Sequence, residues 1–165
     1  MSIQDILNEC AVKYSQPQRL HGEDSFRFAC SVSFVPDGGR GLAGGEAGIP
    51  DELTEFWRVC DSAKLFFDVD YGQWGLSLLN QEDSHARTVE YAEMRSADTR
   101  PGDVVVGEFL GDLDLLVLAP SESGSSRIRV GLPLDPRAEW YSVGRDLEDF
   151  LKRYVGSLGR KFWVD

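Results

Sequence analysis

Two apolar runs in the middle of the chain are joined by a very short connection. Residues Val104 to Leu110 and Leu113 to Leu118 are both strand-like, and only Gly111-Asp112 separates them. A two-residue link of this composition is typical of a β-hairpin, because parallel strands need a crossover of about a dozen residues. The chain is therefore predicted to contain a sheet in which antiparallel pairing predominates.

Other segments alternate between apolar and polar residues, which is typical of strands with one face on a core. One such strand is predicted from Phe26 to Phe34. A second, Leu65 to Tyr71, is expected to place its odd-numbered residues on one face and Asp68 and Asp70 on the other. Three further strand-like stretches are Trp74–Leu78, Ile128–Leu132 and Trp140–Val143.

Helical periodicity is found at four places along the chain, at residues 3–14, 50–60, 84–95 and 147–158. Ser2 and Asp146 stand where N-caps are preferred, and Pro50 is suited to the first position of a helix. The third segment is polar and is expected to lie exposed. The predicted fold is therefore α+β, with a mostly antiparallel sheet (a mixed sheet is the alternative) and flanking helices, in a single domain of residues 1–165.

The charge of the chain limits its partners. The 28 acidic and 17 basic residues give a net charge of −11. An acidic surface repels nucleic acid and anionic lipid but attracts a basic protein, so a protein partner is predicted, with neither nucleic acid nor membrane. Acidic surfaces also serve simply for solubility, which is the alternative interpretation of this charge.

The three cysteines are isolated residues, Cys10, Cys30 and Cys60. Their odd number and the absence of paired spacing indicate reduced thiols in a cytoplasmic protein. No stretch reaches the roughly 18 apolar residues that a membrane span needs.

Signals for catalysis or for cofactor binding are weak. His21 and His85 stand in polar segments, and neither neighbours a nucleophile motif. The glycine-rich stretch from Pro36 to Gly48 matches GxGxxG at Gly39–Gly44, but no helix is predicted at its last glycines, as a dinucleotide-binding turn requires. No catalytic residue, cofactor-binding residue or metal ligand is predicted; a small ligand beside Gly38–Gly48 is a minor alternative.

Acidic and aromatic residues gather after the second predicted strand. Asp68 and Asp70 follow the period of a strand, as Asp112 and Asp114 do, and are read first as solvent-facing acids. Tyr and Trp combine a large apolar area with a polar tip, which suits interface anchors as well as cores. The candidate partner-binding surface consists of Asp68, Asp70, Tyr71, Gln73 and Trp74.

Several short motifs in residues 49–158 resemble the SUKH superfamily, of the Smi/Knr type. The run Ile49–Trp57 looks like the Pro-initiated helix of those domains, and Asp61–Phe66 like the turn and short strand that follow it. Val104–Leu118, with Gly107, resembles their glycine-punctuated hairpin, and Arg145–Leu151 their closing helix. Residues 1–48, which contain the first helix, the first strand and the glycine-rich loop, diverge from that pattern.

The resemblance implies an α+β domain without catalytic residues. Many bacterial members resemble immunity proteins encoded beside polymorphic toxins, often nucleases, whose basic surfaces would suit an acidic partner. The expected function is a non-enzymatic immunity protein that neutralises such a toxin. The alternative is a regulatory or scaffolding module with a protein partner in the host cell.

Overall fold

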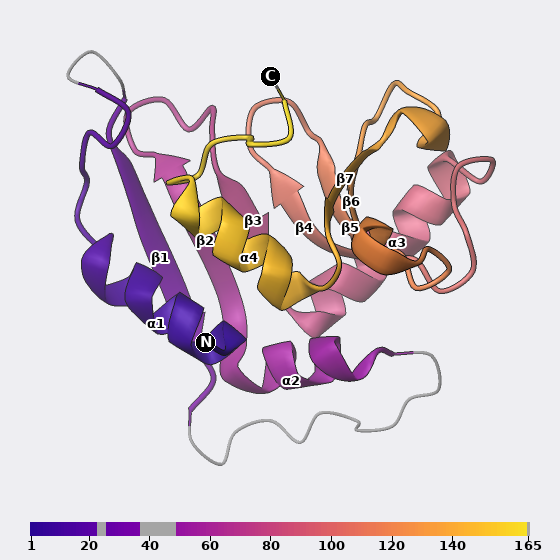
Figure 1. Cartoon of the computed structure of the whole chain (residues 1–165), viewed down its shortest axis with the longest axis horizontal. Helices are drawn as coiled ribbons and strands as arrows, with labels where there is room; N and C mark the ends of the chain where they lie inside the picture. The colour runs from indigo at the N-terminus through magenta and orange to yellow at the C-terminus, as the bar shows by residue number, and fades with distance from the viewer. Residues whose placement is uncertain (23–25, 37–48, 165) are drawn as a thin grey trace.

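The centre of the protein is one antiparallel sheet. The computed structural model describes residues 1–22, 26–36 and 49–164. Its seven strands are β1 (Phe28–Phe34), β2 (Cys60–Asp68), β3 (Leu76–Leu78), β4 (Val104–Phe109), β5 (Leu115–Leu118), β6 (Ile128–Gly131) and β7 (Tyr141–Gly144). Their order in the sheet is their order in the chain, so β1 and β7 form the two edges (Figure 1). The predicted single-domain α+β fold is confirmed, and all the strand pairs are antiparallel.

In the described part of the chain, four α-helices cover the two faces of this sheet unequally. They are α1 (Ile3–Lys13), α2 (Asp51–Val59), α3 (Gln81–Met94) and α4 (Leu147–Gly156). Helices α1, α2 and α4 lie on one face, and α3 lies behind the sheet in Figure 1. Because side chains alternate along a strand, Val104 and Val106 of β4 join the larger core, whereas Val105 packs with Tyr91 of α3.

Local signals explain where the helices begin. The Ser2 hydroxyl accepts from the N–H of Asp5, whose carboxylate accepts from the N–H of Ser2, a reciprocal capping box. Asp146 caps α4 by accepting from the N–H of Asp149 at 2.7 Å. Pro50 precedes the first residue of α2 and does not itself belong to the helix. The helix predicted over 84–95 is α3, which begins earlier and buries Ser84 and Tyr91 although its other residues are largely polar.

Strand β2 differs from its predicted form. No turn occurs at Asp61-Ser62, because α2 runs directly into β2 at Cys60. Phe66 adopts the left-handed conformation (φ 51°) and adds a residue to β2 opposite β1, which makes a bulge. The expected alternation therefore slips by one residue, so that Asp68 is buried. The prediction that Asp68 faces solvent is wrong for this reason.

The predicted hairpin is present, but its connection is longer than two residues. Strands β4 and β5 pair antiparallel, and residues 110–114 link them. Leu113 is left-handed (φ 67°) and 70% exposed, and the carboxylate of Asp112 accepts from the N–H of Asp114. Gly111 is required here, because a Cβ at this position would lie 2.1 Å from the carbonyl oxygen of Gln73 in the neighbouring connection.

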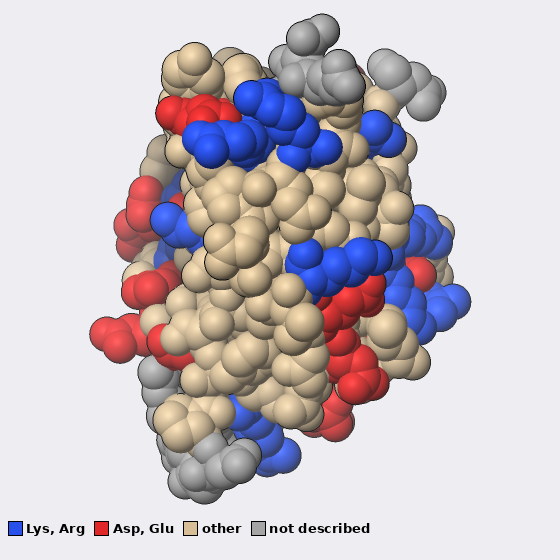
Figure 2. All heavy atoms as spheres, turned by 90° about the vertical axis from the view of Figure 1, so that its left-hand side faces the viewer, with Lys and Arg blue, Asp and Glu red and all other residues tan. Residues whose placement is uncertain are grey.

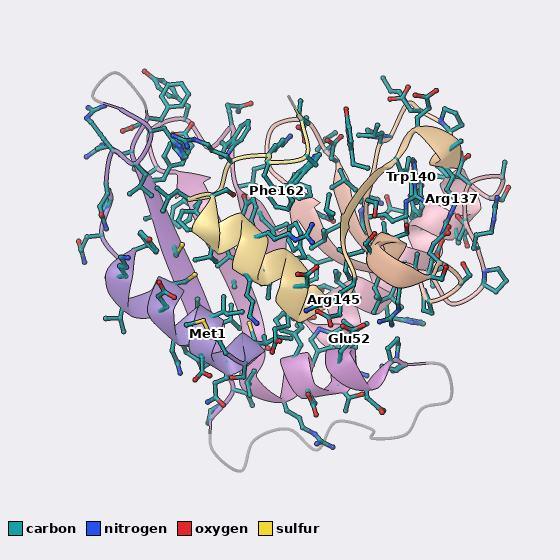
Figure 3. The ribbon with its side chains drawn as sticks, in the orientation of Figure 1. Met1, Glu52, Arg137, Trp140, Arg145 and Phe162 are labelled. Atoms are coloured by element: carbon teal, nitrogen blue, oxygen red, sulfur yellow. The ribbon has the colours of Figure 1, made fainter. Side chains whose placement is uncertain are left out.

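A buried arginine joins the connections at the β7 side of the sheet. Arg137 donates to both carboxylate oxygens of Asp103, at 2.6 and 3.2 Å, and to Glu122 at 3.1 Å. Its guanidinium also lies 5.1 Å from the ring centre of Trp140, and Figure 3 shows the two residues on the same side of the fold. The side chains of Arg137 and Asp103 are 6% and 3% exposed, so removing either partner leaves a buried charge without compensation.

We expect Arg137→Ala to lower the free energy of unfolding by about 3–5 kcal/mol, measured by urea denaturation, because Asp103 would stay buried. Arg145→Ala is the matched control, since the Arg145 side chain is 68% exposed and its carboxylate partner is 4.0 Å away. This variant should stay within about 0.5 kcal/mol of the wild type. Equal losses in the two variants would contradict the role given to the buried pair.

Candidate protein-binding surface

The predicted surface residues lie in the connection between β2 and β3. This connection is next to the start of β1, because Phe28 pairs with Asp68 at the end of β2. The structure therefore brings Phe26 and Arg27, the residues before β1, beside the predicted set. We call Phe26, Arg27, Asp70, Tyr71 and Gln73 the turn surface.

Asp68 organises the connection from inside. Its carboxylate accepts from the backbone N–H groups of Asp70 at 2.9 Å, Tyr71 at 3.0 Å and Gln73 at 3.4 Å. The Asp68 side chain is buried, so it acts as a support for the turn and offers no contact area to a partner. A carboxylate that accepts several N–H groups fixes the backbone more firmly than a neutral acceptor would.

Asp70 is held by Arg27. The guanidinium Nη2 of Arg27 lies 2.6 Å from Oδ1 of Asp70, and the backbone N–H of Arg27 donates to Oδ2 at 3.0 Å. These hydrogen bonds from Arg27 hold the pKa of Asp70 below its ordinary value of 3.8. The carboxylate is thus kept ionised and in one orientation, with its negative charge largely matched by Arg27.

Two aromatic rings stand exposed beside this ion pair. Tyr71 is 70% exposed and Phe26 is 46% exposed, and their ring centres are 5.2 Å apart in an edge-to-face arrangement. Exposed aromatic residues held by a rigid turn form a small apolar contact area without a large loss of conformational entropy on binding. This pair is the main apolar feature of the turn surface.

Trp74 belongs to the support of the turn. Its indole Nε1 donates to the carbonyl oxygen of Gly159 at 2.9 Å, and Lys161 lies 5.0 Å from its ring centre. Lys161 also contacts Asp112 and lies 3.8 Å from Asp114, so this second pair of acids forms ion pairs with a lysine. These contacts hold the segment after α4 against Trp74 and against the β4–β5 connection.

Phe26 and Arg27 belong to this surface although the sequence pattern does not predict it. Phe26 continues the alternation of Phe28 and Cys30, which predicts a buried face, but it precedes β1 and is exposed. Arg27 reaches a carboxylate that is 43 positions away in the chain. Only the pairing of β1 with β2 brings the two together, and periodicity within one segment carries no signal for it.

Other reactive groups are dispersed or buried. His21 is partly buried, which lowers its pKa together with the charge of Arg160, and His85 lies on exposed helix α3. The three thiols are buried, and burial raises the pKa of Cys60 to about 12. Within residues 1–22, 26–36 and 49–164, no cluster of His, Cys, Asp or Glu is arranged to hold a metal ion. The glycine-rich motif at 39–44 lies outside the described residues.

Grooves formed by the described residues lie on the helical face. The first, of about 450 Å³, is lined by the N-terminal ends of α1 and α4 and by α2, and includes Glu52, Glu55 and Glu148. Figure 3 shows Glu52 near Arg145 at this end of the helices. Glu52 is already engaged, since it binds Arg127 at 3.1 Å and accepts from the N–H of Leu147 at 3.0 Å. The second groove, of about 370 Å³, lies between α1 and α4.

The fold and the turn surface define an α+β domain with an exposed aromatic pair. Comparisons with family models, with curated proteins and with solved structures found no match to this chain. None of the helices in the described part of the chain combines the length and hydrophobicity of a membrane-spanning helix.

The Arg27–Asp70 pair predicts a specific pH dependence. Because the folded pKa of Asp70 is depressed, its contribution to stability is present above pH 3.8 and is lost as the pH falls through the folded pKa. We expect Asp70→Asn to lower the melting temperature relative to the wild type near pH 6, with a difference that shrinks towards pH 2. Arg27→Gln should show the same trend, and the double variant should add little to either single loss. Additive, pH-independent losses would contradict the pairing.

Proposed function

We propose that this chain is a non-enzymatic, protein-binding domain of the SUKH type that neutralises a basic toxin domain, of the nuclease class, in a bacterial polymorphic toxin system. The observation that carries the proposal is the exposed Phe26–Tyr71 pair on a turn fixed by Asp68 and by the Arg27–Asp70 ion pair. The resemblance of residues 49–158 to SUKH domains supplies the class of partner.

The negative charge of the chain and its exposed aromatic pair support an inhibitory complex. The net charge of −11 would speed association with a basic partner, and the aromatic pair would supply apolar contact at the centre of the interface. Nucleases are basic because they bind phosphate groups, so an acidic protein can cover the same surface. The three buried, unpaired thiols suit action in the reducing cytoplasm.

The partner can be captured by photo-crosslinking at the turn surface. A benzoylphenylalanine in place of Tyr71 should crosslink a basic protein in a lysate of the cells that produce the chain, as identified by mass spectrometry. The same substitution at Tyr141, a tyrosine of β7 that is 36% exposed, is the matched control and should not capture this protein. Capture at both positions alike, or of host housekeeping proteins only, would contradict the proposal and favour a regulatory module.

With the captured partner purified, Tyr71→Ala should weaken the complex by about 2 kcal/mol, a roughly thirtyfold rise in Kd, measured by calorimetry. The variant should stay folded, because Tyr71 is 70% exposed. Tyr141→Ala should leave the Kd unchanged. Wild-type protein should also inhibit the partner's nuclease activity at equimolar concentration; binding without inhibition would contradict neutralisation.

A further inference from the structure

Edge strand β1 is covered along only part of its outer side. The N–H of Phe28 donates to the carbonyl oxygen of Gln18 at 2.8 Å, and the N–H of Cys30 donates to that of Tyr14 at 2.7 Å. The segment after α1 therefore covers the first half of the strand. Since N–H direction alternates along a strand, the N–H groups of Val32 and Phe34 point to the same outer side.

The described residues leave the second half of this edge uncovered. Within the described part of the chain, no residue accepts the outward N–H groups of Val32 and Phe34. Ser31 and Ser33 are exposed, and Phe34 keeps 36% of its surface exposed although it is a large apolar residue. We call residues 31–34 the open edge, because among the described residues the outward backbone groups of Val32 and Phe34 have no partner.

Proteins usually protect such an edge, and β7 at the other side of the sheet is protected. The Ser142 hydroxyl of β7 donates to the carbonyl oxygen of Ser125, and the short 3₁₀ helix Gly124–Ser126 packs against that strand. Strand β1 contains no charged residue and no proline to block pairing. The open edge is therefore a template for a further strand.

The charge of the exposed residues around the open edge indicates which partner can bind there. In the covering segment Val12, Ser15, Gln16 and Pro17 are exposed and uncharged, whereas Lys13 and, on β2 opposite Ser31, Lys64 are exposed cations. Figure 2 shows the corresponding broad uncharged area on the side of the molecule that carries β1. Two copies that each carry a charge of −11 repel one another over most of their surfaces, and they can approach where the exposed residues are mostly neutral and the charged ones are lysines.

We infer that a second copy of this chain pairs with the open edge, so that two β1 strands lie antiparallel across a two-fold axis. In a two-fold interface the same patch of each copy must supply both donors and acceptors. Val32 and Phe34 each offer an outward N–H donor and an outward C=O acceptor, so two open edges can pair with one another. Pairing would also cover Phe34. The inference goes beyond the proposed function, because Phe26 of the turn surface lies about 26 Å from Phe34 along the extended strand.

The test compares two serines that are cross-strand neighbours. Ser33 of β1 and Ser62 of β2 are both exposed and directly opposite one another, but only Ser33 lies on the edge strand. We expect light scattering after gel filtration to give twice the chain mass of 18.4 kDa at high concentration. Ser33→Lys should raise the dimer Kd roughly tenfold or more, because it brings like charges together across the two-fold axis, whereas Ser62→Lys should not.

A second variant tests the backbone contribution. Val32→Pro removes an outward N–H while leaving the N–H groups that face β2, and it should give a monomer whose circular dichroism matches that of the wild type. A wild-type protein that stays monomeric at about 200 µM, a concentration comparable to the Kd of weak dimers, would overturn the inference. So would an equal Kd for Ser33→Lys and Ser62→Lys. Crosslinking at Tyr71 tests the proposed function separately, so the dimer and the proposed function can be contradicted independently of one another.

Discussion

Hydrogen bonding between strands that are consecutive in the chain determines the arrangement of the whole molecule. Every strand pairs antiparallel with its sequence neighbour; the β1–β2 connection contains α2, the β3–β4 connection contains α3, and the other connections are short. The turn surface depends on this order, since the β2–β3 connection can meet the start of β1 only because β1 is next to β2. The edge position of β1 follows from the same order.

The buried carboxylates show how polar groups maintain this arrangement. Asp68 satisfies three backbone N–H groups in one connection, and Asp103 holds Arg137 in another. Both groups lie where the chain leaves the regular hydrogen bonding of the sheet. A buried charge is tolerated there because its bonding partners fix the conformation of a connection that apolar contacts alone would leave variable.

The features that the sequence predicted are local ones. Ser2 and Asp146 are recognisable as caps because a cap acts on residues three positions away, and β4 and β5 are recognisable by their short link. The left-handed Phe66 could not be predicted, because an aromatic residue accepts this conformation only when tertiary packing compensates for its cost. That single residue changes the face of Asp68 and so the composition of the candidate surface. The Phe26–Tyr71 contact depends on strand pairing and is likewise invisible to periodicity.

The position of α4 has a consequence for biosynthesis. Tyr154 of this helix packs its ring 5.9 Å from that of Phe66 in β2, and α4 also lies against α1. Strands β1 to β4 can pair while the ribosome is still translating later codons, but the part of their apolar face that α4 covers stays open until α4 has emerged. During that interval the nascent chain exposes the rings that later form its core, and it is a candidate client for chaperones that hold hydrophobic segments.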